Sequence, residues 1–479
     1  MFLRPFARRL LFGLVVLVVT LFPVGPNLRA RARQQQRKLT SLQLGRAQDM
    51  LASVHAGVKK NSYDPKYHGL DVDARYKEFL ERLKHAPTLG EAFRTIAAFL
   101  SGLNDSHTFF IPPRRGYRFD YGYRMQMVGD RCMITGVRPG SDAEKKLHPG
   151  DQVVSLGKFA VNRGDLWQLE YYLNSLAPMP ATDFSLRDPA GNLRNEQVVT
   201  KYINVGHMKD MTIEGGLSGY WQLIMEEEQE EHLLRNRYVE AGDLMIWQLP
   251  MFIDDENAMA DMFAKARKHK ALILDLRGNP GGDVTALEFM LGSVFDHDVK
   301  IATQVMRKDQ KDLIAKSRKG NAFTGQLIVL VDSRSASASE LFARVVQLEH
   351  RGTVVGDLSS GSVMESQVFP YQIGMEDLGG FDLDAMARSQ GGVNLPQDQQ
   401  GGYGTIVFYA ASITRADLIM QDGKSLEKVG VTPDVMALPT AADLAAGRDP
   451  VLAKAAELAG AKLDPAAAGK MFPFEWAPQ

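Results

Sequence analysis

The spacing of apolar residues changes several times along the chain and divides it into regions of different predicted structure. Helical spacing dominates residues 41–103, where Leu44 and Ala47 begin the first apolar stripe. Short apolar runs separated by Gly-Asp and Pro-Gly turns follow over 118–202 and predict a β-rich region. From Leu244 onward, strand-length runs alternate with helical stripes, which predicts an α/β region with right-handed crossovers.

The clearest of these patterns lies between Gln326 and Gln347. The unbroken apolar run Leu327–Val331 has the length of a strand that is buried on both faces. After a turn, apolar residues recur at helical intervals, beginning with Ala338 and Leu341. Ser337 therefore stands where a helix begins, and there free N–H groups and the helix dipole favour developing negative charge. This place suits a nucleophile, although a serine at a helix start is also an ordinary cap.

A second strand, Ala271–Leu276, runs into the sequence Arg277-Gly-Asn-Pro-Gly-Gly282. Two glycines after a proline allow the backbone to turn its N–H groups outward, as an oxyanion hole requires. Asp-Leu-Arg-Gly-Asn-Pro-Gly-Gly, together with Ser-Ala-Ser-Ala-Ser-Glu over 335–340, resembles the core of the tail-specific (carboxyl-terminal processing) and tricorn-type serine proteases.

The resemblance implies a fold and a set of catalytic groups. The fold is α/β, with a ClpP/crotonase-like spiral protease core. The nucleophile is the middle serine, Ser337. The oxyanion hole is formed by the N–H of Ala338 with that of Gly281 or Gly282.

The chain departs from the tail-specific pattern at the general base. Those proteases place a lysine where this chain has Ser362, and no lysine occurs between Lys319 and Lys424. Tricorn-type members carry a Ser-His pair where the helical region ends, and Ser106-His107 stands at that place. The resemblance implies that His107 is the base, since histidine is suited to proton transfer near neutral pH, and that Ser106 belongs to its relay.

The carboxylate of this constellation is expected to be Glu427. It lies in Glu-Lys-Val-Gly-Val-Thr-Pro-Asp, which resembles the family's Glu-x-x-Gly-Val-x-Pro-Asp end piece. Without the resemblance, a histidine near two phenylalanines is more often a structural residue, and Glu427 has the alternative of an exposed turn glutamate.

The β-rich region resembles a PDZ domain in the order of its strands, its Gly-Asp turns and its helix. PDZ domains add an extended peptide to a sheet edge and hold its terminal carboxylate on backbone N–H groups. Tyr121-Gly122-Tyr123 stands where that carboxylate loop is expected, which predicts binding of substrate C-termini. The alternative is a PDZ fold that acts as a spacer or lid with an empty groove.

The N-terminus predicts export. Arg4, Arg8 and Arg9 precede the apolar run Leu10–Phe22, which is short for a membrane span and typical of a signal peptide. Residues 30–32, Ala-Arg-Ala, offer a cleavage site, and an uncleaved anchor that attaches the protein to the membrane is the alternative. We therefore expect a periplasmic, secreted or membrane-anchored protein outside the cytoplasm.

Composition narrows the classes of partner. The formal net charge is −1, which argues against a nucleic-acid partner. The single cysteine, Cys132, cannot form an internal disulfide. The acidic run over 226–231 lacks the histidine spacing of a metal site, so neither a metal nor another cofactor is expected.

These patterns predict an exported serine endopeptidase that cleaves protein or peptide substrates by acyl transfer. The expected divisions are a signal peptide or anchor (1–32), a helical subdomain (41–115), a PDZ-like domain (118–202), the protease core (204–440) and a helical tail (441–479). An insertion over 372–402 is long enough to be a lid. The alternative function is a non-catalytic ligand- or peptide-binding protein on the same fold. The sequence leaves the oligomeric state open.

Overall fold

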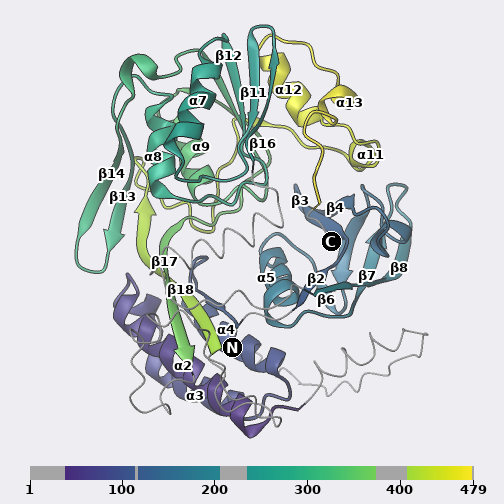
Figure 1. The fold of residues 1–479 in the computed structure, drawn as a ribbon, viewed down its shortest axis with the longest axis vertical. Helices are drawn as coiled ribbons and strands as arrows, with labels where there is room; N and C mark the ends of the chain where they lie inside the picture. Colours follow the sequence, from purple (N-terminus) through teal and green to yellow (C-terminus); the bar gives the residue numbers. More distant parts are fainter. Residues whose placement is uncertain (1–37, 114–116, 205–234, 374–406, 477–479) are drawn as a thin grey trace, which may run out of the picture.

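The computed structural model describes residues 38–113, 117–204, 235–373 and 407–476. These residues form three bodies that meet around the middle of the molecule: an α/β core, a group of helices at the N-terminal end, and a β-rich module (Figure 1). The mixed α/β fold predicted from the sequence is confirmed. The segments expected to hold the signal peptide and most of the 372–402 insertion lie outside the described residues.

The core is built on one mainly parallel sheet. Four neighbouring strands of this sheet are parallel and lie in the same order as in the chain, and they are β11 (Leu244–Gln248), β12 (Ala271–Asp275), β15 (Gln326–Val331) and β16 (Gly352–Gly356). β10 (Arg237–Ala241) adds antiparallel to one edge, and β19 (Val435–Met436) adds parallel to the other. Every residue of β12 is buried, as expected of a strand with both faces covered.

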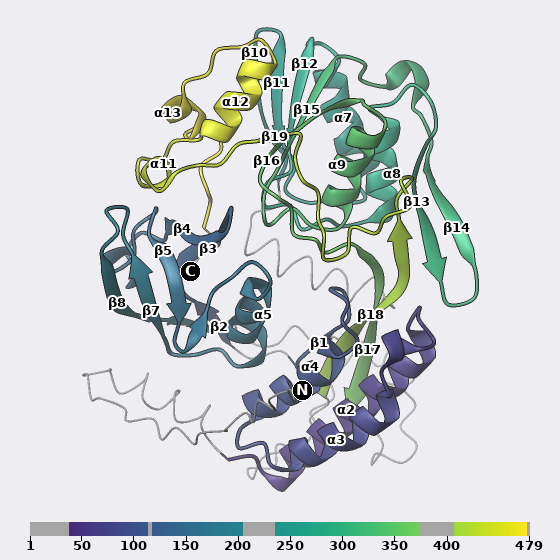
Figure 2. The same cartoon turned by 180° about the vertical axis from the view of Figure 1, so that it is seen from behind.

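Helices cover both faces of this sheet (Figures 1 and 2). One face carries α7 (Glu256–Ala266), α8 (Val284–Gly292) and α9 (Ala338–Leu348), and the other carries α12 (Pro450–Leu458) and α13 (Pro465–Ala468). The predicted tail from 441 is thus three short helices, of which α11 (Ala441–Ala445) is the first, and two of them complete the core.

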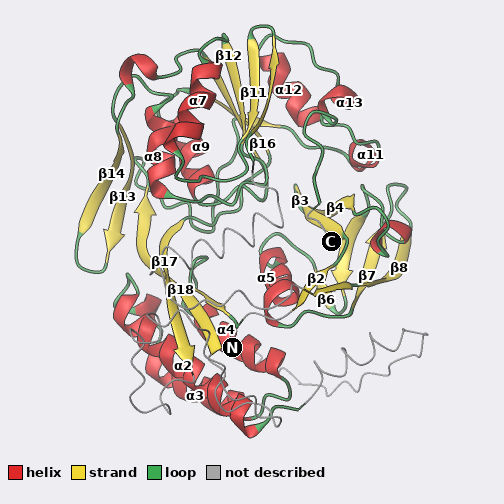
Figure 3. Ribbon diagram, viewed as in Figure 1, coloured by secondary structure: helices red, strands yellow, loops and turns green. Residues whose placement is uncertain are grey.

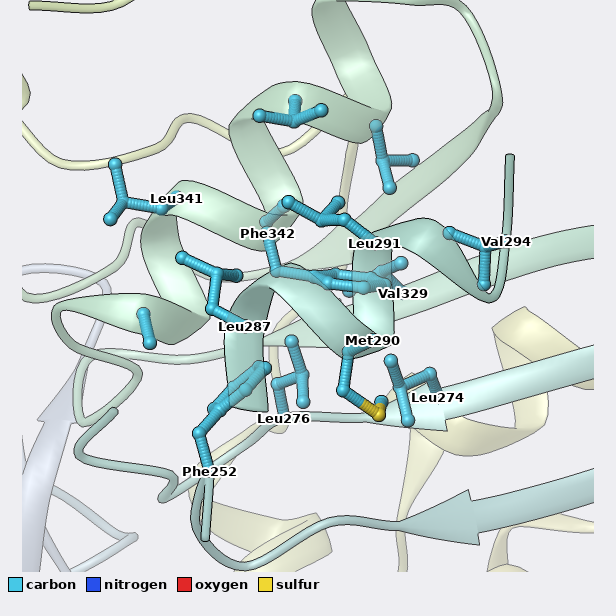
Figure 4. Packing of buried hydrophobic residues seen from close by; sticks show 14 of the residues in the cluster. Phe252, Leu274, Leu276, Leu287, Met290, Leu291, Val294, Val329, Leu341 and Phe342 are labelled. Atoms are coloured by element: carbon cyan, nitrogen blue, oxygen red, sulfur yellow. The ribbon is translucent and has the colours of Figure 1, made fainter. Parts of the chain in front are cut away.

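The first of these faces fixes the helix that begins after Ser337. Phe342 of α9 is fully buried and points among the side chains of α8 and the sheet, including Leu291 and Val329 (Figure 4). Its ring lies 6.2 Å from that of Phe252. Removal of such a ring from a packed core costs about 3–5 kcal/mol, so the direction of α9 is firmly set.

The N-terminal helices are α2 (Ser41–Asn61), α3 (Val72–Lys84) and α4 (Leu89–Ser101). They begin at the side-chain caps Thr40, Asp71 and Thr88. A second sheet joins them to the core, and its strands are β1 (Phe109–Ile111), β13 (Val299–Met306), β14 (Gln310–Ala315), β17 (Met364–Ile373) and β18 (Val407–Ile419).

The long strand β18 makes this connection. It pairs with β13 near its end and with β1 near its middle, and its buried residues Tyr409, Ala411 and Ile413 pack in the cluster of the helices. The end of the helical region is therefore held next to the core.

The β-rich module consists mainly of strands (Figure 3). Its larger sheet has the order β3-β4-β5-β7-β8, with β6 paired to β5. Its strands are β3 (Tyr123–Val128), β4 (Arg131–Val137), β5 (Gln152–Leu156), β6 (Phe159–Ala160), β7 (Ala181–Arg187) and β8 (Leu193–Val199). β2 (Tyr117–Asp120) pairs with β9 (Lys201–Asn204) where the chain enters and leaves the module. Helix α5 (Leu166–Tyr171), which continues as a π-helical turn, packs on the sheet. Over the described residues, no helix is long and apolar enough to cross a membrane.

Candidate active site

Ser337 stands between β15 and α9, in a backbone conformation that is rare for a side-chain-bearing residue. Its φ is 54° and its ψ is −118°, while the next residue begins the helix. A non-glycine residue with positive φ is strained and persists only where its surroundings fix it. The strain, at a sharp turn from strand to helix, is typical of functional residues.

The two neighbouring serines of the motif differ from Ser337 in burial and partners. Ser335 and Ser339 are fully buried. The Ser335 hydroxyl donates to the carbonyl of Leu276, and that of Ser339 donates to the carbonyl of Asn279. Both therefore bind the turn that ends β12, whereas Ser337 is partly exposed.

The glycine loop after β12 lies against the Ser337 turn. A Cβ atom built on Gly281 would stand 2.7 Å from Ser337 Cβ and 2.9 Å from the backbone nitrogen of Ala338. No side chain fits there, so glycine is required by this close approach as well as by its φ of 104°.

The three predicted oxyanion-hole amides differ in their hydrogen bonds. The N–H of Gly281 already donates to Asn279 Oδ1, at 2.8 Å. Neither the N–H of Gly282 nor that of Ala338 has an acceptor among the residues that the structure describes. Of the two glycines, Gly282 is thus the one with an available N–H in this arrangement.

A second group of predicted residues meets where the helical region ends. Ser106 Oγ lies 2.7 Å from Glu427 Oε2 and 2.8 Å from Nδ1 of His107. The N–H of Ser106 also donates to Glu427, at 2.7 Å. Asp105 fixes this turn, because its carboxylate accepts hydrogen bonds from the N–H groups of His107 and Thr108. Residues that are far apart in the sequence are brought together here by β18.

The direction of these hydrogen bonds defines the state of the imidazole. An ionised carboxylate can only accept, so the Ser106 hydroxyl must donate its proton to Glu427. Its oxygen is then left to accept from His107, which requires the proton of the neutral ring to be on Nδ1. Nε2 consequently carries the lone pair and can take a proton. The arrangement Glu427–Ser106–His107 is that of a general base held in one tautomer.

Burial shifts the pKa values of both titrating groups in this relay. It lowers the pKa of His107 to about 4, since the charged imidazolium is disfavoured in a desolvated place. It also raises the pKa of Glu427, against the opposing effect of the hydrogen bonds from Ser106 and Val363. The His107 ring is therefore neutral at physiological pH, as a base must be.

The relay and Ser337 are joined by one loop. The N–H of Val363 donates to Glu427 at 3.0 Å, while the carbonyl of the preceding residue, Ser362, accepts from the N–H of Ser337 at 2.9 Å. Among the described residues, the Ser337 hydroxyl makes no direct hydrogen bond to the His107 ring. Such contacts are commonly long in free enzymes and tighten when substrate binds.

Sequence reasoning assigned no role to Glu340, although it ends the quoted Ser-Ala-Ser-Ala-Ser-Glu motif. Its buried carboxylate accepts from the N–H of Ser337 and from the loop that contains Ser362. The spacing Ser337-x-x-Glu340 is that of a capping box, a signal that could have identified it. The described residues contain no group of His, Cys, Asp or Glu side chains that could hold a metal ion.

The three residues predicted to capture a peptide carboxylate, Tyr121, Gly122 and Tyr123, each contact a different part of the β-rich module. The N–H of Gly122 donates to the chain's own Asp120, and the Tyr121 hydroxyl donates to the carbonyl of Leu173. Tyr123 is the first residue of β3, packs on the core of the module, and pairs with Val137 of β4. An incoming carboxylate would have to replace Asp120 at Gly122.

With this geometry established, comparison with known proteins identifies the fold. Residues 244–437 match the sequence profile of peptidase family S41. The match lies within the α/β core, which is therefore similar to peptidase family S41. The family predicted from the two motifs is thereby confirmed, and the matched segment of the S41 core includes β11, the glycine loop, Ser337 and Glu427.

Relatives of both predicted kinds are found for the S41 core. A tail-specific protease of Haemophilus influenzae is 26% identical over 304 residues, which are 57% of this chain and 40% of that protein. A putative tricorn protease homolog 2 of Streptomyces coelicolor is 27% identical over 191 residues, 40% of this chain and 13% of that protein. The chain thus spans less than half the length of either relative.

The crystal structure of mature CPAF shares the fold. It superposes with a TM-score of 0.58 at 15% identity, covering 85% of this chain and 95% of that chain. The similarity therefore extends beyond the segment matched by the family profile.

Proposed function

We propose that this protein is a serine endopeptidase that hydrolyses peptide bonds of protein substrates through an acyl-enzyme. The observation that carries the proposal is the Glu427–Ser106–His107 relay, which leaves Nε2 of the imidazole free and is joined through Ser362 and Val363 to the strained turn of Ser337.

The proposed reaction follows the logic of an activated serine. Ser337 Oγ attacks the scissile carbonyl carbon while its proton passes to His107 Nε2. The N–H groups of Ala338 and of the glycine loop stabilise the oxyanion. The C–N bond then breaks, the imidazolium gives its proton to the leaving amine, and water repeats the sequence to release the acid. Glu427 and Ser106 orient the ring throughout.

The remaining features of the proposal come from the resemblance and the relatives. We infer that the core is a ClpP/crotonase-like spiral, because β11, β12, β15 and β16 are neighbours in the sheet, keep the order that they have in the chain, and have the helices α7, α8 and α9 on one face. We infer that the β-rich module is PDZ-like, with β3 as an edge strand of its sheet next to α5. Export to a compartment outside the cytoplasm rests on the N-terminal sequence.

A fluorophosphonate probe tests the central claim. It should label the protein at Ser337, and Ser337→Ala should abolish both labelling and peptide hydrolysis while the fold is kept. A folded protein that neither reacts with the probe nor cleaves peptides would instead favour the non-catalytic binding protein on the same fold. Cleavage of matched substrates with a free and an amidated C-terminus then tests recognition of the carboxylate, and equal rates would argue against it.

A further inference from the structure

A carboxyl group that the proposed reaction does not use lies beside the nucleophile. Glu340, in the first turn of α9, is completely buried. Its oxygens accept four hydrogen bonds. Oε1 accepts from Ser359 Oγ at 2.5 Å and from the N–H of Gly361 at 2.7 Å. Oε2 accepts from the N–H of Ser362 at 2.9 Å and from that of Ser337 at 3.1 Å.

All four partners are donors, and this matches the chemistry of an ionised carboxylate. A carboxylate offers only acceptor lone pairs, so every partner is satisfied at once. A protonated Oε2 would face two backbone N–H donors, and a proton on Oε1 could be accepted only by the Ser359 hydroxyl, which would then have to turn its own proton away. An amide in place of the carboxylate would turn its NH₂ group toward at least one backbone N–H. The site is therefore shaped for negative charge at the N-terminus of α9, where the helix dipole also favours it.

The groups that Glu340 holds are those that define the nucleophile's position. Ser337 has a strained backbone, and its N–H is shared between Glu340 and the carbonyl of Ser362. Strained conformations persist when several contacts fix them together. The loop from Ser359 to Val363 is itself held on one side by Glu340 and on the other by Glu427, which accepts from Val363.

We propose that Glu340 is a positioning residue, whose ionised carboxylate holds the Ser337 turn and the loop 359–363 in the arrangement from which Ser337 reacts. This inference rests on the proposed function, because it assigns Glu340 to the same reaction. It connects the nucleophile to the relay through a single loop, so that loss of the carboxylate misplaces Ser337 with respect to His107.

The geometry predicts how activity depends on pH. The groups facing Glu340 are the Ser359 hydroxyl and the three backbone N–H groups, and the charged group on the other side of the loop is Glu427. Burial raises the pKa of Glu340 to about 7, against the opposing effect of those hydrogen bonds. The ionised form is present above that pKa and is lost as the pH falls through it. Activity should therefore fall on the acid side of neutral, well above the pKa of about 4 of His107.

Two substitutions separate positioning from structural support. Glu340→Gln keeps the volume of the side chain but removes its charge, and Glu340→Asp keeps the charge on a shorter stem. The matched control is Glu349→Gln, which alters the same residue type at the opposite end of α9, where Glu349 accepts from Gln421. We expect Glu340→Gln to lower kcat by at least about 30-fold with KM within about threefold, since two charge-assisted hydrogen bonds are lost in the reacting state.

The pH profile gives a readout that a merely structural residue would not change. The acid limb near pH 7 should disappear in Glu340→Gln and persist in Glu340→Asp, which should recover part of kcat. The control variant should match the wild type in kcat and in profile. A Glu340→Gln protein with the kcat and acid limb of the wild type would overturn the proposal.

A measurement independent of activity completes the test. Amide hydrogen exchange at Gly361 and Ser362 should be faster in Glu340→Gln than in the wild type at pH 8, with thermal unfolding showing that the variant is folded. Unchanged exchange would refute the role of Glu340 even if hydrolysis cannot be measured. Absence of labelling at Ser337 in the wild type would instead count against the proposed function, so the two failures are distinguishable.

Discussion

Glu427→Gln is the substitution that examines the relay most directly. The carboxylate accepts three hydrogen bonds, from the N–H and the hydroxyl of Ser106 and from the N–H of Val363. A glutamine amide has one oxygen for these donors. If the glutamine oxygen accepts from the Ser106 hydroxyl, the amide NH₂ group faces the backbone N–H of Ser106. That N–H is then left without its acceptor.

The opposite orientation is worse for catalysis. The amide NH₂ would then donate to Ser106 Oγ, whose own proton would turn to Nδ1 of His107. The ring would have to carry its proton on Nε2, the nitrogen that must accept the proton of Ser337. Either orientation loses one or two hydrogen bonds to a charged group, about 2–4 kcal/mol, which corresponds to a loss of about 30- to 1,000-fold in kcat/KM.

The assay is kcat/KM on a peptide substrate, together with ¹⁵N NMR of the imidazole, assigned with His107→Gln. Nε2 of His107 should give the signal of an unprotonated nitrogen in the wild type and shift toward that of a protonated one in Glu427→Gln. Glu365→Gln is the control, because Glu365 lies two residues beyond Val363 and contacts Gln304 instead of Ser106. If Glu427→Gln keeps kcat/KM within about threefold and the same ring signal, the relay is wrong.

Three further predictions follow from the same contacts. In Glu340→Gln the remaining acid limb should lie near pH 4, because the neutral form of His107 is needed and burial lowers its pKa to about 4; a limb near 6.5 would contradict this. Ser337→Ala should abolish hydrolysis and change the free energy of unfolding by only about 1 kcal/mol. Ser339→Ala should retain activity but lower the free energy of unfolding by about 1–2 kcal/mol, because it leaves a buried carbonyl without its hydrogen bond. An inactive Ser339→Ala together with an active Ser337→Ala would mean that Ser339 is the nucleophile. Arg334→Ala should lower kcat. A double-mutant cycle with Glu170→Ala should show coupling between the two side chains, which form a hydrogen bond, and additive effects of the two substitutions would contradict this coupling.

The prediction for Arg334 comes from the contacts of the edge strand β3, to which the sequence analysis assigned no partner. β3 is the first strand of its sheet, and its carbonyls at Met125 and Met127 accept from Arg334 and Ser333. These two residues belong to the turn between β15 and Ser337. Removal of the whole module would expose this turn, so point substitutions examine the role of the module more cleanly than a deletion does.

The local structure that was predicted correctly around the candidate site depends on short stretches of sequence. The strand, turn and helix around Ser337 follow from an apolar run, small residues and a helical stripe within one segment. The glycine loop after β12 is equally local. Such patterns are set by backbone sterics and by burial of one face, which nearby residues determine.

The parts that could not be predicted depend on distant contacts. Asp105, Thr108 and Thr414 fix the turn of His107 through hydrogen bonds within the segment before β1 and between that segment and β18, and no spacing in the sequence reveals these contacts. The burial of Glu340 is equally invisible, since a glutamate three residues into a helix is usually a solvated cap. The acidic run over 226–231 and residues 374–402 of the predicted insertion lie outside the described residues.

Under the proposed function, the loop at Ser362 explains how the core can work without the lysine that the resemblance to tail-specific proteases implies at this position. Ser362 contributes to the site through its backbone, because its N–H donates to Glu340 and its carbonyl accepts from Ser337. Its hydroxyl pairs with that of Ser360 at an exposed position. Backbone groups are supplied by any residue except proline, so the loop can keep its shape while the side chain changes. In the proposed mechanism the base is instead His107, because a histidine is neutral near working pH without the desolvation that a lysine base needs. The same loop, through Val363 and Glu427, holds the relay of His107 in place.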